Sequence, residues 1–336
     1  MSKDLFEMCH AIDTEATRSR HGWTYCRSGS PALSDSEPCV VTIGAFDGVH
    51  RGHRSLVESA LEDARERGVR CVAVTFDPDP ADVVGSSRMG TRLMRVADRR
   101  DALIRLGIDS VVVVSFTTTV ATLEPQAFVD DVLLRTMRAV CVHVGSNFRF
   151  GRHGAGDVDV LAALGAQRGF DVTAHELLDA GDEHISSTRI RQLLRSSRLE
   201  EANDLLGHWH FVRGTVLHGR GEGTSFGFPT ANVECEPMDC LPAEGVYACY
   251  VVQGNLAWPA AANVGAPPTF AEARPAFLEA NLIGFGGDLY GAEVTVFFVK
   301  WLRASREFDS LRELEKEVLA NISWVRHNLG SQALEV

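Results

Sequence analysis

The stretch that decides the fold is Cys39–Leu56, CVVTIGAFDGVHRGHRSL. It begins with a short apolar run of mostly β-branched residues at 40–43, which favours a buried strand. A glycine-bearing turn follows, and then HRGH at 50–53, where a helical pattern of apolar residues begins. A strand, a turn and a helix start in this order direct backbone N–H groups and the positive end of the helix to one point. The stretch therefore predicts a phosphate-binding site.

Two imidazoles in this loop, His50 and His53, are three residues apart. Both can face a bound phosphate, as hydrogen-bond donors or, if protonated, as cations. On their own they are as consistent with two surface or core histidines at a helix start. The order of strand, Phe-Asp-Gly-Val turn and helix favours the functional interpretation.

The composition is typical of an ordinary globular protein with two domains: 336 residues, 45% hydrophobic and 23% charged. A net charge of −12 argues against a nucleic-acid partner held by bulk electrostatics. No run approaches 18 apolar residues and the first residues do not resemble a signal peptide, which favours no membrane partner and a cytoplasmic protein. The eight cysteines include no C-x-x-C pair and no zinc spacing, so Cys71 and Cys141 are interpreted as buried thiols.

Residues 38–206 alternate between strand-like and helix-like segments, after a poorly ordered extension at 1–37. Strands are predicted at 39–46, 69–76, 110–116, 139–144 and 170–175, and helices at 53–67, 98–106, 125–137 and 157–168. Near-continuous apolar strands with helices between them predict a parallel sheet covered on both faces. Ligands of such sheets bind beyond the carboxyl ends of the strands.

Polar segments follow the second, fourth and fifth predicted strands: TFDPDP at 75–80, GSNFRFGRHGAGD at 145–157 and ISSTRIR at 185–191. In the segment at 145–157, the glycines leave the backbone accessible to a ligand, and Asn147 and Arg149 offer an amide and a positive charge to a nucleotide. In the third, Arg189 and Arg191 stand in the first helical turn, where cations oppose the helix dipole unless an anion binds there. Asp79, in the first, is a carboxylate that would repel phosphates unless a metal intervenes.

The character of the chain changes after residue 207 to short strands and turns, predicted at 209–217, 245–253, 256–264, 277–285 and 293–302, with a helix at 309–328. This pattern predicts a small closed β-barrel with a terminal helix. The segment HGRGEGTSFGFPTAN at 218–232 contains no Walker sequence, which excludes an ordinary P-loop kinase. Thr230 and Asn232, two residues apart, could present a hydroxyl and an amide oxygen to one Mg²⁺.

Several of these segments carry a resemblance to a known family. GAFDGVHRGH resembles the HxGH signature of nucleotidylyltransferases, and with ISSTRIR, GFPTAN and DLYG (288–291) it is similar to the bacterial bifunctional riboflavin kinase/FMN adenylyltransferases, or FAD synthetases. The resemblance covers residues 38 to about 328. It implies an α/β fold class, with a Rossmann-like nucleotidylyltransferase domain at 38–206 and a riboflavin kinase barrel with a terminal helix at 207–336.

The resemblance also implies a set of site residues. The catalytic residues would be His50 and His53 in the first domain and Glu279, as the kinase base, in the second. ATP and phosphates would be bound by Gly44, Phe46, Asp47, Gly48, Asn147, Arg149, Ser186, Ser187, Thr188, Arg189, Arg191, Gly219, Gly221, Gly223 and Thr224. The flavin would contact Asn263, Arg303 and Phe308, and Thr230 and Asn232 would hold the metal.

The partners that follow from the resemblance are ATP, riboflavin and FMN, with Mg²⁺ as cofactor, in a monomer or weak homo-oligomer. Three positions depart from the family pattern: Asp79 replaces a usual His, Gly284 a usual Asp, and Asn281 lies where a His is common. Two alternatives therefore stay open. The protein could retain one activity only or use a variant flavin or nucleotide, or it could be a flavin-binding regulator without turnover.

Overall fold

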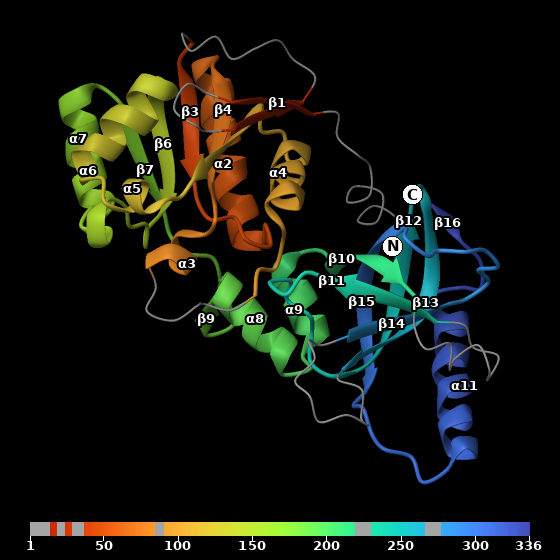
Figure 1. The fold of residues 1–336 in the computed structure, drawn as a ribbon. Coiled ribbons are helices and arrows are strands. Elements are labelled where there is room, and N and C mark those ends of the chain that lie inside the picture. Colours follow the sequence, from red (N-terminus) through yellow and green to blue (C-terminus); the bar gives the residue numbers. More distant parts are fainter. Residues whose placement is uncertain (1–13, 19–23, 29–36, 85–90, 219–229, 266–276) are drawn as a thin grey trace. The chain divides into compact units, whose positions relative to one another are not determined.

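The structure is a computed structural model that describes residues 14–18, 24–28, 37–84, 91–218, 230–265 and 277–336 (Figure 1). Its contacts divide the described chain into two compact units. The sheet unit contains the described residues of 11–90 together with 95–186. The barrel unit contains 91–94 and the described residues of 187–336.

Five strands of the sheet unit are parallel, in the spatial order β5-β4-β3-β6-β7. Their bounds are β3 Cys39–Ile43, β4 Arg70–Asp77, β5 Ser110–Ser115, β6 Ala139–Gly145 and β7 Asp171–His175. The strand order reverses between β3 and β6, and ligands of parallel sheets bind beyond the carboxyl ends of the strands at such a point. The predicted parallel sheet is therefore confirmed.

Helices cover both faces of this sheet. On one face α2 (Arg51–Arg67) packs on β3, β4 and β6, and α4 (Val96–Arg105) packs on β4 and β5. On the other face α6 (Pro125–Phe128), the π-helix η1 (Val129–Thr136) and α7 (Val158–Arg168) close a core against Val41, Ile43 and Val142. The shorter elements are α3 (Pro80–Val84), α5 (Thr118–Ala121), the 3₁₀ turn η2 (Arg152–Gly154), β8 (Asp179–Ala180) and β9 (Glu183–His184).

The amino-terminal extension contributes two strands, β1 (Thr14–Arg18) and β2 (Thr24–Ser28). They pair antiparallel with each other, and β2 pairs antiparallel with β5 at the edge of the sheet. The expectation of a poorly ordered extension does not hold for these ten residues. The reason is that a strand at a sheet edge is fixed by pairing with a distant segment, which local periodicity does not reveal.

Six strands of the barrel unit form a closed antiparallel barrel, because β12 pairs with β13 as well as with β15. The order is β12-β15-β10-β11-β14-β13, with β16 (Leu334–Glu335) added to β13. The bounds are β10 His210–Leu217, β11 Ala231–Cys235, β12 Gly245–Gln253, β13 Leu256–Gly265, β14 Phe277–Leu282 and β15 Glu293–Arg303. The terminal helix α11 (Leu311–Asn328) packs on β12 and β13. The barrel and its helix confirm the prediction, although β11 was missed.

Two helices predicted with the first domain, α8 (Ser187–Arg195) and α9 (Leu199–Leu206), lie in the barrel unit. The amide of Asn203 on α9 donates to the carbonyl oxygen of Phe298 at 3.0 Å and accepts from the backbone N–H of His210 at 2.7 Å. These bonds tie α9 to β15 and β10. The contacts therefore divide the chain about 20 residues before the predicted boundary at 206.

Gly284, where the family usually has Asp, has a backbone φ of +81°. A Cβ atom there would lie 2.5 Å from the carbonyl oxygen of Ser331. The backbone conformation and the close approach of this carbonyl both require glycine. The replacement of the usual Asp by glycine at position 284 is therefore explained by the backbone conformation of the chain after β14.

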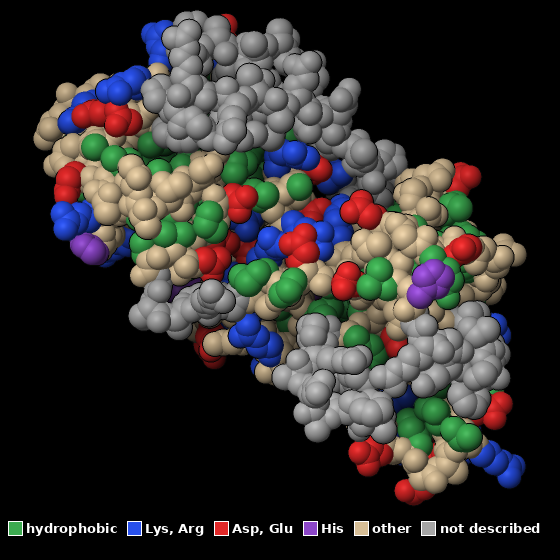
Figure 2. All heavy atoms as spheres, in the orientation of Figure 1, with side chains coloured by type: hydrophobic (Ala, Val, Ile, Leu, Met, Phe, Trp, Pro, Cys, Tyr) green, Lys and Arg blue, Asp and Glu red, His purple; other side chains and the backbone are tan. Residues whose placement is uncertain are grey.

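The side chains of the described surface are mixed in charge. Figure 2 shows Lys and Arg intermingled with Asp and Glu on the face that it draws. Among the described helices, none combines the length and the apolar composition that a membrane crossing requires.

Candidate active sites

The first candidate site is built on the amino terminus of α2, at the carboxyl end of β3. His50 is the N-cap residue of the helix, and its Nδ1 accepts a hydrogen bond from the backbone N–H of His53 at 3.2 Å. An accepting Nδ1 carries no proton, so the proton of the neutral ring is on Nε2. The His50 ring is thereby oriented as a hydrogen-bond donor through Nε2.

His53 stacks on His50, with ring centroids 3.6 Å apart and planes 14° apart. Burial lowers the pKa of His53 well below its usual value, and the charges of His50 and Arg99 lower it further. Within the described residues its Nδ1 is buried and has no hydrogen-bond partner. Of the two protonation states that the sequence left open, the structure favours a neutral imidazole with one nitrogen available to a ligand.

The loop before the helix is shaped by Gly44, Phe46 and Gly48. Phe46 is fully buried and its ring contacts the His53 ring edge-on at 5.3 Å. A Cβ on Gly44 would lie 3.2 Å from the Phe46 ring, and Gly48 has a φ of +84°. The Phe46 ring packs against the His53 imidazole and the two glycines have no side chain, so any contact of these residues with a phosphate would come from their backbone.

A buried charge cluster lies beside the imidazoles. The guanidinium of Arg99, on α4, is 3.4 Å from a carboxylate oxygen of Asp47 and 3.3 Å from both oxygens of Asp79. The exposed fractions of the Arg99 and Asp47 side chains are 3% and 2%, against 17% for Asp79. Arg99 thus supplies the positive charge that Asp79 needs, in the place of the metal considered from the sequence.

The pKa of Asp79 is raised by burial, while Arg99 opposes the rise. Sequence reasoning did not single out Arg99, because it lies about 20 residues after Asp79 on an ordinary amphipathic helix. The sequence signal that could have identified Arg99 is the pair of carboxylates, Asp47 and Asp79, in two loops of the predicted site. Two carboxylates in buried loops require a cation nearby.

Asn147 follows β6, the neighbour of β3, and its side chain is exposed at the carboxyl edge of the sheet. Arg149 forms an ion pair with Asp157 at 3.1 Å, and Asp157 caps α7 by accepting from the backbone N–H of Val160. Asn147 therefore lies at the edge of the sheet where ligands of parallel sheets bind. Arg149 is paired with Asp157, the N-cap residue of α7.

The segment ISSTRIR approaches the same loop at its start. The carbonyl oxygen of Ile185 lies 3.9 Å from the position of a Cβ on Gly52, so Ser186 follows close to the start of α2. Ser187 begins α8 in the barrel unit, which also holds Thr188 and Arg189. In that unit Nε of Arg191 donates to the carbonyl oxygen of Thr91 at 2.7 Å.

The second candidate site lies on three adjacent strands of the barrel. Glu279 on β14 is directly opposite Asn232 on β11 and directly opposite Asn263 on β13. Side chains directly opposite on neighbouring antiparallel strands have Cβ atoms about 4.5–5.5 Å apart. The barrel thus brings together the predicted base, one predicted metal ligand and one predicted flavin contact.

The alternation of the strands directs these three side chains away from the barrel core. Leu278 and Ala280, on either side of Glu279, are 1% and 0% exposed, while Glu279 is half-buried. Asn232 and Asn263 likewise lie between buried neighbours. Thr230 directly precedes β11 and is two residues before Asn232, so in an extended chain the two side chains lie on the same face. A hydroxyl, an amide oxygen and a nearby carboxylate form a donor set that fits Mg²⁺.

The other predicted flavin contacts lie close to each other: Arg303 is the last residue of β15, and Phe308 lies in the segment that follows. The guanidinium of Arg303 is 5.6 Å from the centroid of the Phe308 ring, and that of Arg306 is 4.9 Å from it. Ser305, between them, donates to Oδ1 of Asn263 at 3.5 Å. This segment therefore continues the surface on which Asn263 and Glu279 lie. The predicted phosphate-loop residues Gly219, Gly221, Gly223 and Thr224 lie outside the described residues.

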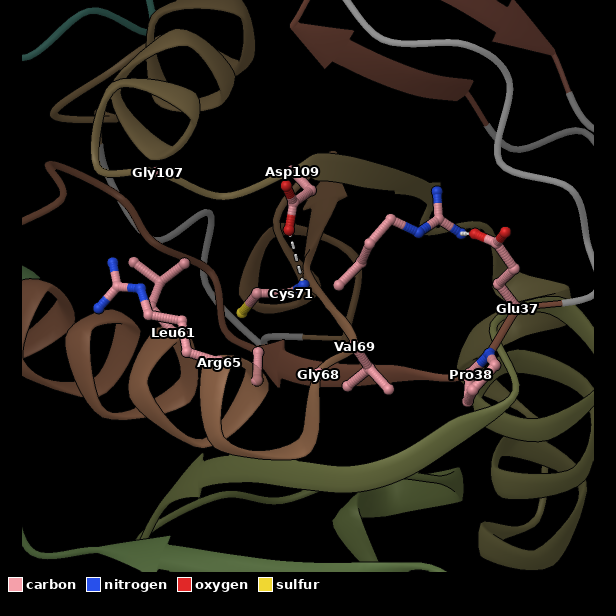
Figure 3. A pocket seen from close by; sticks show the side chains of 11 residues that line it. Glu37, Pro38, Leu61, Arg65, Gly68, Val69, Cys71, Gly107 and Asp109 are labelled. Atoms are coloured by element: carbon pink, nitrogen blue, oxygen red, sulfur yellow. Dashed lines mark hydrogen bonds and ion pairs between the residues drawn. The ribbon is translucent and has the colours of Figure 1, made fainter.

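A hollow of about 570 Å³ opens at the amino ends of the parallel strands, away from the imidazoles (Figure 3). It lies where β4 and β5 begin, and in its lining the carboxylate of Asp109 accepts from the backbone N–H of Cys71 at 2.9 Å. Since ligands of parallel sheets bind at the opposite edge, this hollow is separate from the first candidate site.

The fold and the two sites define a class of protein: a nucleotidyltransferase sheet joined to a flavokinase barrel. Two family models match the chain, FAD synthetase over residues 32–189 and riboflavin kinase over residues 206–329. A bifunctional riboflavin kinase/FMN adenylyltransferase of Escherichia coli K12 is 38% identical over 295 residues, covering 88% of this chain and 94% of the relative. Relatives with the same description from Pseudomonas fluorescens and Bacillus subtilis are 35% and 34% identical, covering 86% and 83% of this chain and 92% and 89% of their own lengths.

This chain belongs to the bifunctional riboflavin kinase/FMN adenylyltransferase family. A crystal structure from Streptococcus pneumoniae, described as a macrolide-efflux protein, shares its fold. The TM-score is 0.79 at 29% identity, covering 87% of this chain and 94% of that one.

Proposed function

We propose that the chain catalyses two successive reactions: it phosphorylates riboflavin to FMN with one ATP and adenylylates FMN to FAD with a second, releasing pyrophosphate. The observation that carries this proposal is the presence of two differently built sites in one chain. One has stacked neutral imidazoles at a helix start, and the other has a carboxylate between two amides on a barrel wall. Family membership supports both half-reactions.

In the barrel, Glu279 accepts the proton of the ribityl hydroxyl as this oxygen attacks the γ-phosphorus of ATP. The bond from the γ-phosphorus to the bridging oxygen breaks, and ADP leaves. Thr230 and Asn232 would hold Mg²⁺, which when bound neutralises charge on the transferred phosphoryl group. Asn263, Arg303 and Phe308 orient the flavin, Phe308 by stacking and the other two by polar contacts.

In the sheet unit, a phosphate oxygen of FMN attacks the α-phosphorus of ATP and pyrophosphate leaves, so no enzyme nucleophile is required. His50 donates through Nε2, and His53 donates from the nitrogen that carries its proton, to the phosphate oxygens where negative charge accumulates. Asn147 and the hydroxyl of Ser186 in the same unit complete the phosphate contacts. Catalysis at this site is positioning and electrostatic stabilisation.

The remaining assignments belong to the same proposal: a Mg²⁺-dependent cytoplasmic enzyme, a monomer or weak homo-oligomer, with ATP, riboflavin and FMN as partners. The net charge of −12 supports the exclusion of a nucleic-acid partner.

Chromatography of the flavins tests the proposal. The purified protein is incubated with riboflavin, ATP and Mg²⁺, and in a second reaction with FMN in place of riboflavin. FMN and then FAD are expected in the first reaction and FAD in the second. FMN alone would mean a kinase only, and FAD from supplied FMN alone a transferase only. Tight flavin binding with neither product would mean a regulator and would overturn the proposal.

A further inference from the structure

Three metal-ligating side chains meet inside the sheet unit, apart from both candidate active sites. Asp63 of α2 and Cys141 and His143 of β6 bring a carboxylate oxygen, a sulfur and an imidazole nitrogen within 4.8 Å of one another. Cys141 and His143 are two residues apart on one strand, so both point to the face that α2 covers. No local sequence motif contains these residues, and only the fold places them together.

The cluster is remote from the catalytic imidazoles of the same helix. Asp63 follows His53 by ten residues on α2, and a rise of about 1.5 Å per residue separates them by roughly 15 Å along the helix axis. The adenylylation proposed above uses none of the three side chains. The cluster therefore needs an explanation of its own.

Each of the polar ligands has a second partner that fixes its orientation. Oδ1 of Asp63 accepts from Nε of Arg67 at 2.7 Å, which leaves Oδ2 directed at Nε2 of His143, 3.0 Å away. Nδ1 of His143 is 2.9 Å from Nε2 of His175 on β7. In metal centres the second ring nitrogen of a ligating histidine and the second oxygen of a ligating carboxylate are themselves hydrogen-bonded, and both atoms have such a partner in this cluster.

The geometry and the types of ligand point to a transition ion. Zinc bonds to nitrogen, oxygen and sulfur are about 2.0–2.3 Å long, so the ligand atoms of a tetrahedral ion lie roughly 3.3–3.8 Å apart. The three atoms lie within 4.8 Å of one another, so an ion would have to draw them somewhat closer together. Cys141 and His143 are 1% and 3% exposed, and a buried thiol and imidazole suit zinc or cobalt rather than Mg²⁺ or Ca²⁺.

We propose that Asp63, Cys141 and His143 form a binding site for Zn²⁺ or a similar divalent transition ion, with His175 as the outer partner of His143. The ion takes the place of the proton between Nε2 of His143 and Oδ2 of Asp63. Three protein ligands leave a fourth position for water. Because the site joins α2 to β6, ion binding stabilises the helix that carries His50 and His53.

Cobalt provides a direct probe of the site. The full-length protein is treated with a chelator, freed of it and titrated with Co²⁺, and the absorption of the sulfur-to-cobalt charge transfer is recorded. One Co²⁺ per chain with this absorption is expected. Cys141→Ser should remove the absorption, whereas Cys71→Ser, a buried thiol on β4 outside the cluster, should leave it unchanged.

A second variant keeps the test decisive if Cys141→Ser does not fold. Asp63 is partly exposed, and Asp63→Asn keeps its shape, so this variant is expected to fold and to bind Co²⁺ at least about tenfold more weakly. Zn²⁺ should raise the melting temperature of the wild-type protein but not that of Cys141→Ser. Absence of the charge-transfer absorption in the wild type, or its persistence in Cys141→Ser, would overturn the proposal. None of these readouts depends on flavin turnover.

Discussion

The two candidate sites are built by opposite means. In the sheet unit, one contiguous segment supplies the main groups: a strand ends, the chain turns, and a helix begins with His50 as its N-cap residue and His53 in its first turn. In the barrel, Asn232, Asn263 and Glu279 come from three strands, and antiparallel register alone brings them side by side. A site made from one segment depends on local geometry, whereas a site made from several strands depends on the whole barrel.

The largest effect that tests this comparison is expected for Glu279→Gln. The amide keeps the shape of the side chain but cannot accept the hydroxyl proton, so riboflavin phosphorylation should fall by about 10²–10⁴-fold. FAD formation from supplied FMN should not change. Rates of both reactions are measured by flavin chromatography. Glu234→Gln on β11, an exposed carboxylate of the neighbouring strand, is the matched control and should retain kinase activity.

Arg99→Gln tests the buried charge cluster of the sheet site. Removing the cation leaves the carboxylates of Asp47 and Asp79 uncompensated, and breaking such a buried pair costs roughly 3–5 kcal/mol of unfolding free energy. Denaturant unfolding measures the loss. The double variant Arg99→Gln/Asp79→Asn should recover part of it. Equal stability of the single and double variants would show that Asp79 is not a partner of Arg99.

His53→Ala tests the one-segment site. Loss of a single preorganised donor to a developing charge typically lowers turnover by about 10²–10³-fold, and we expect this loss in FAD formation. Riboflavin phosphorylation by the same protein should continue and serves as the internal control. A variant in which both half-reactions fell equally, in folded protein, would contradict the assignment of two independent sites.

The smallest effect concerns the protonation of His53. An ordinary histidine titrates near pH 6.5, but burial and the neighbouring charges of His50 and Arg99 lower the pKa of His53 in the folded protein. Its ring signals in NMR spectra, identified by their absence from His53→Ala, should therefore not shift between pH 8 and about 6. Below pH 6.5 the unfolded chain binds a proton that the folded chain does not. The free energy of unfolding should accordingly fall on acidification, and less so in His53→Ala.

The sequence was sufficient where local pattern determines structure. The apolar strands, the turn before His50 and the barrel strands flanked by turns were predicted close to their observed bounds, because periodicity and glycine-bearing turns act over a few residues. It was insufficient where distant segments meet. Arg99 beside Asp79, the pairing of β2 with β5, and the cluster of Asp63 with His143 all depend on sheet order. Within the described residues, a group of side chains that could hold a metal ion forms across α2 and β6 and not along one segment of the chain.

The antiparallel pair β1 and β2 completes the β5 side of the parallel sheet. The family model begins only at residue 32, so an expression clone trimmed to the recognisable family region would omit both strands. The valine-rich β5 would then present an open row of peptide groups, which is a template for joining chains into aggregates. A clone that lacks the first 31 residues is therefore expected to yield a less soluble protein than the full-length chain.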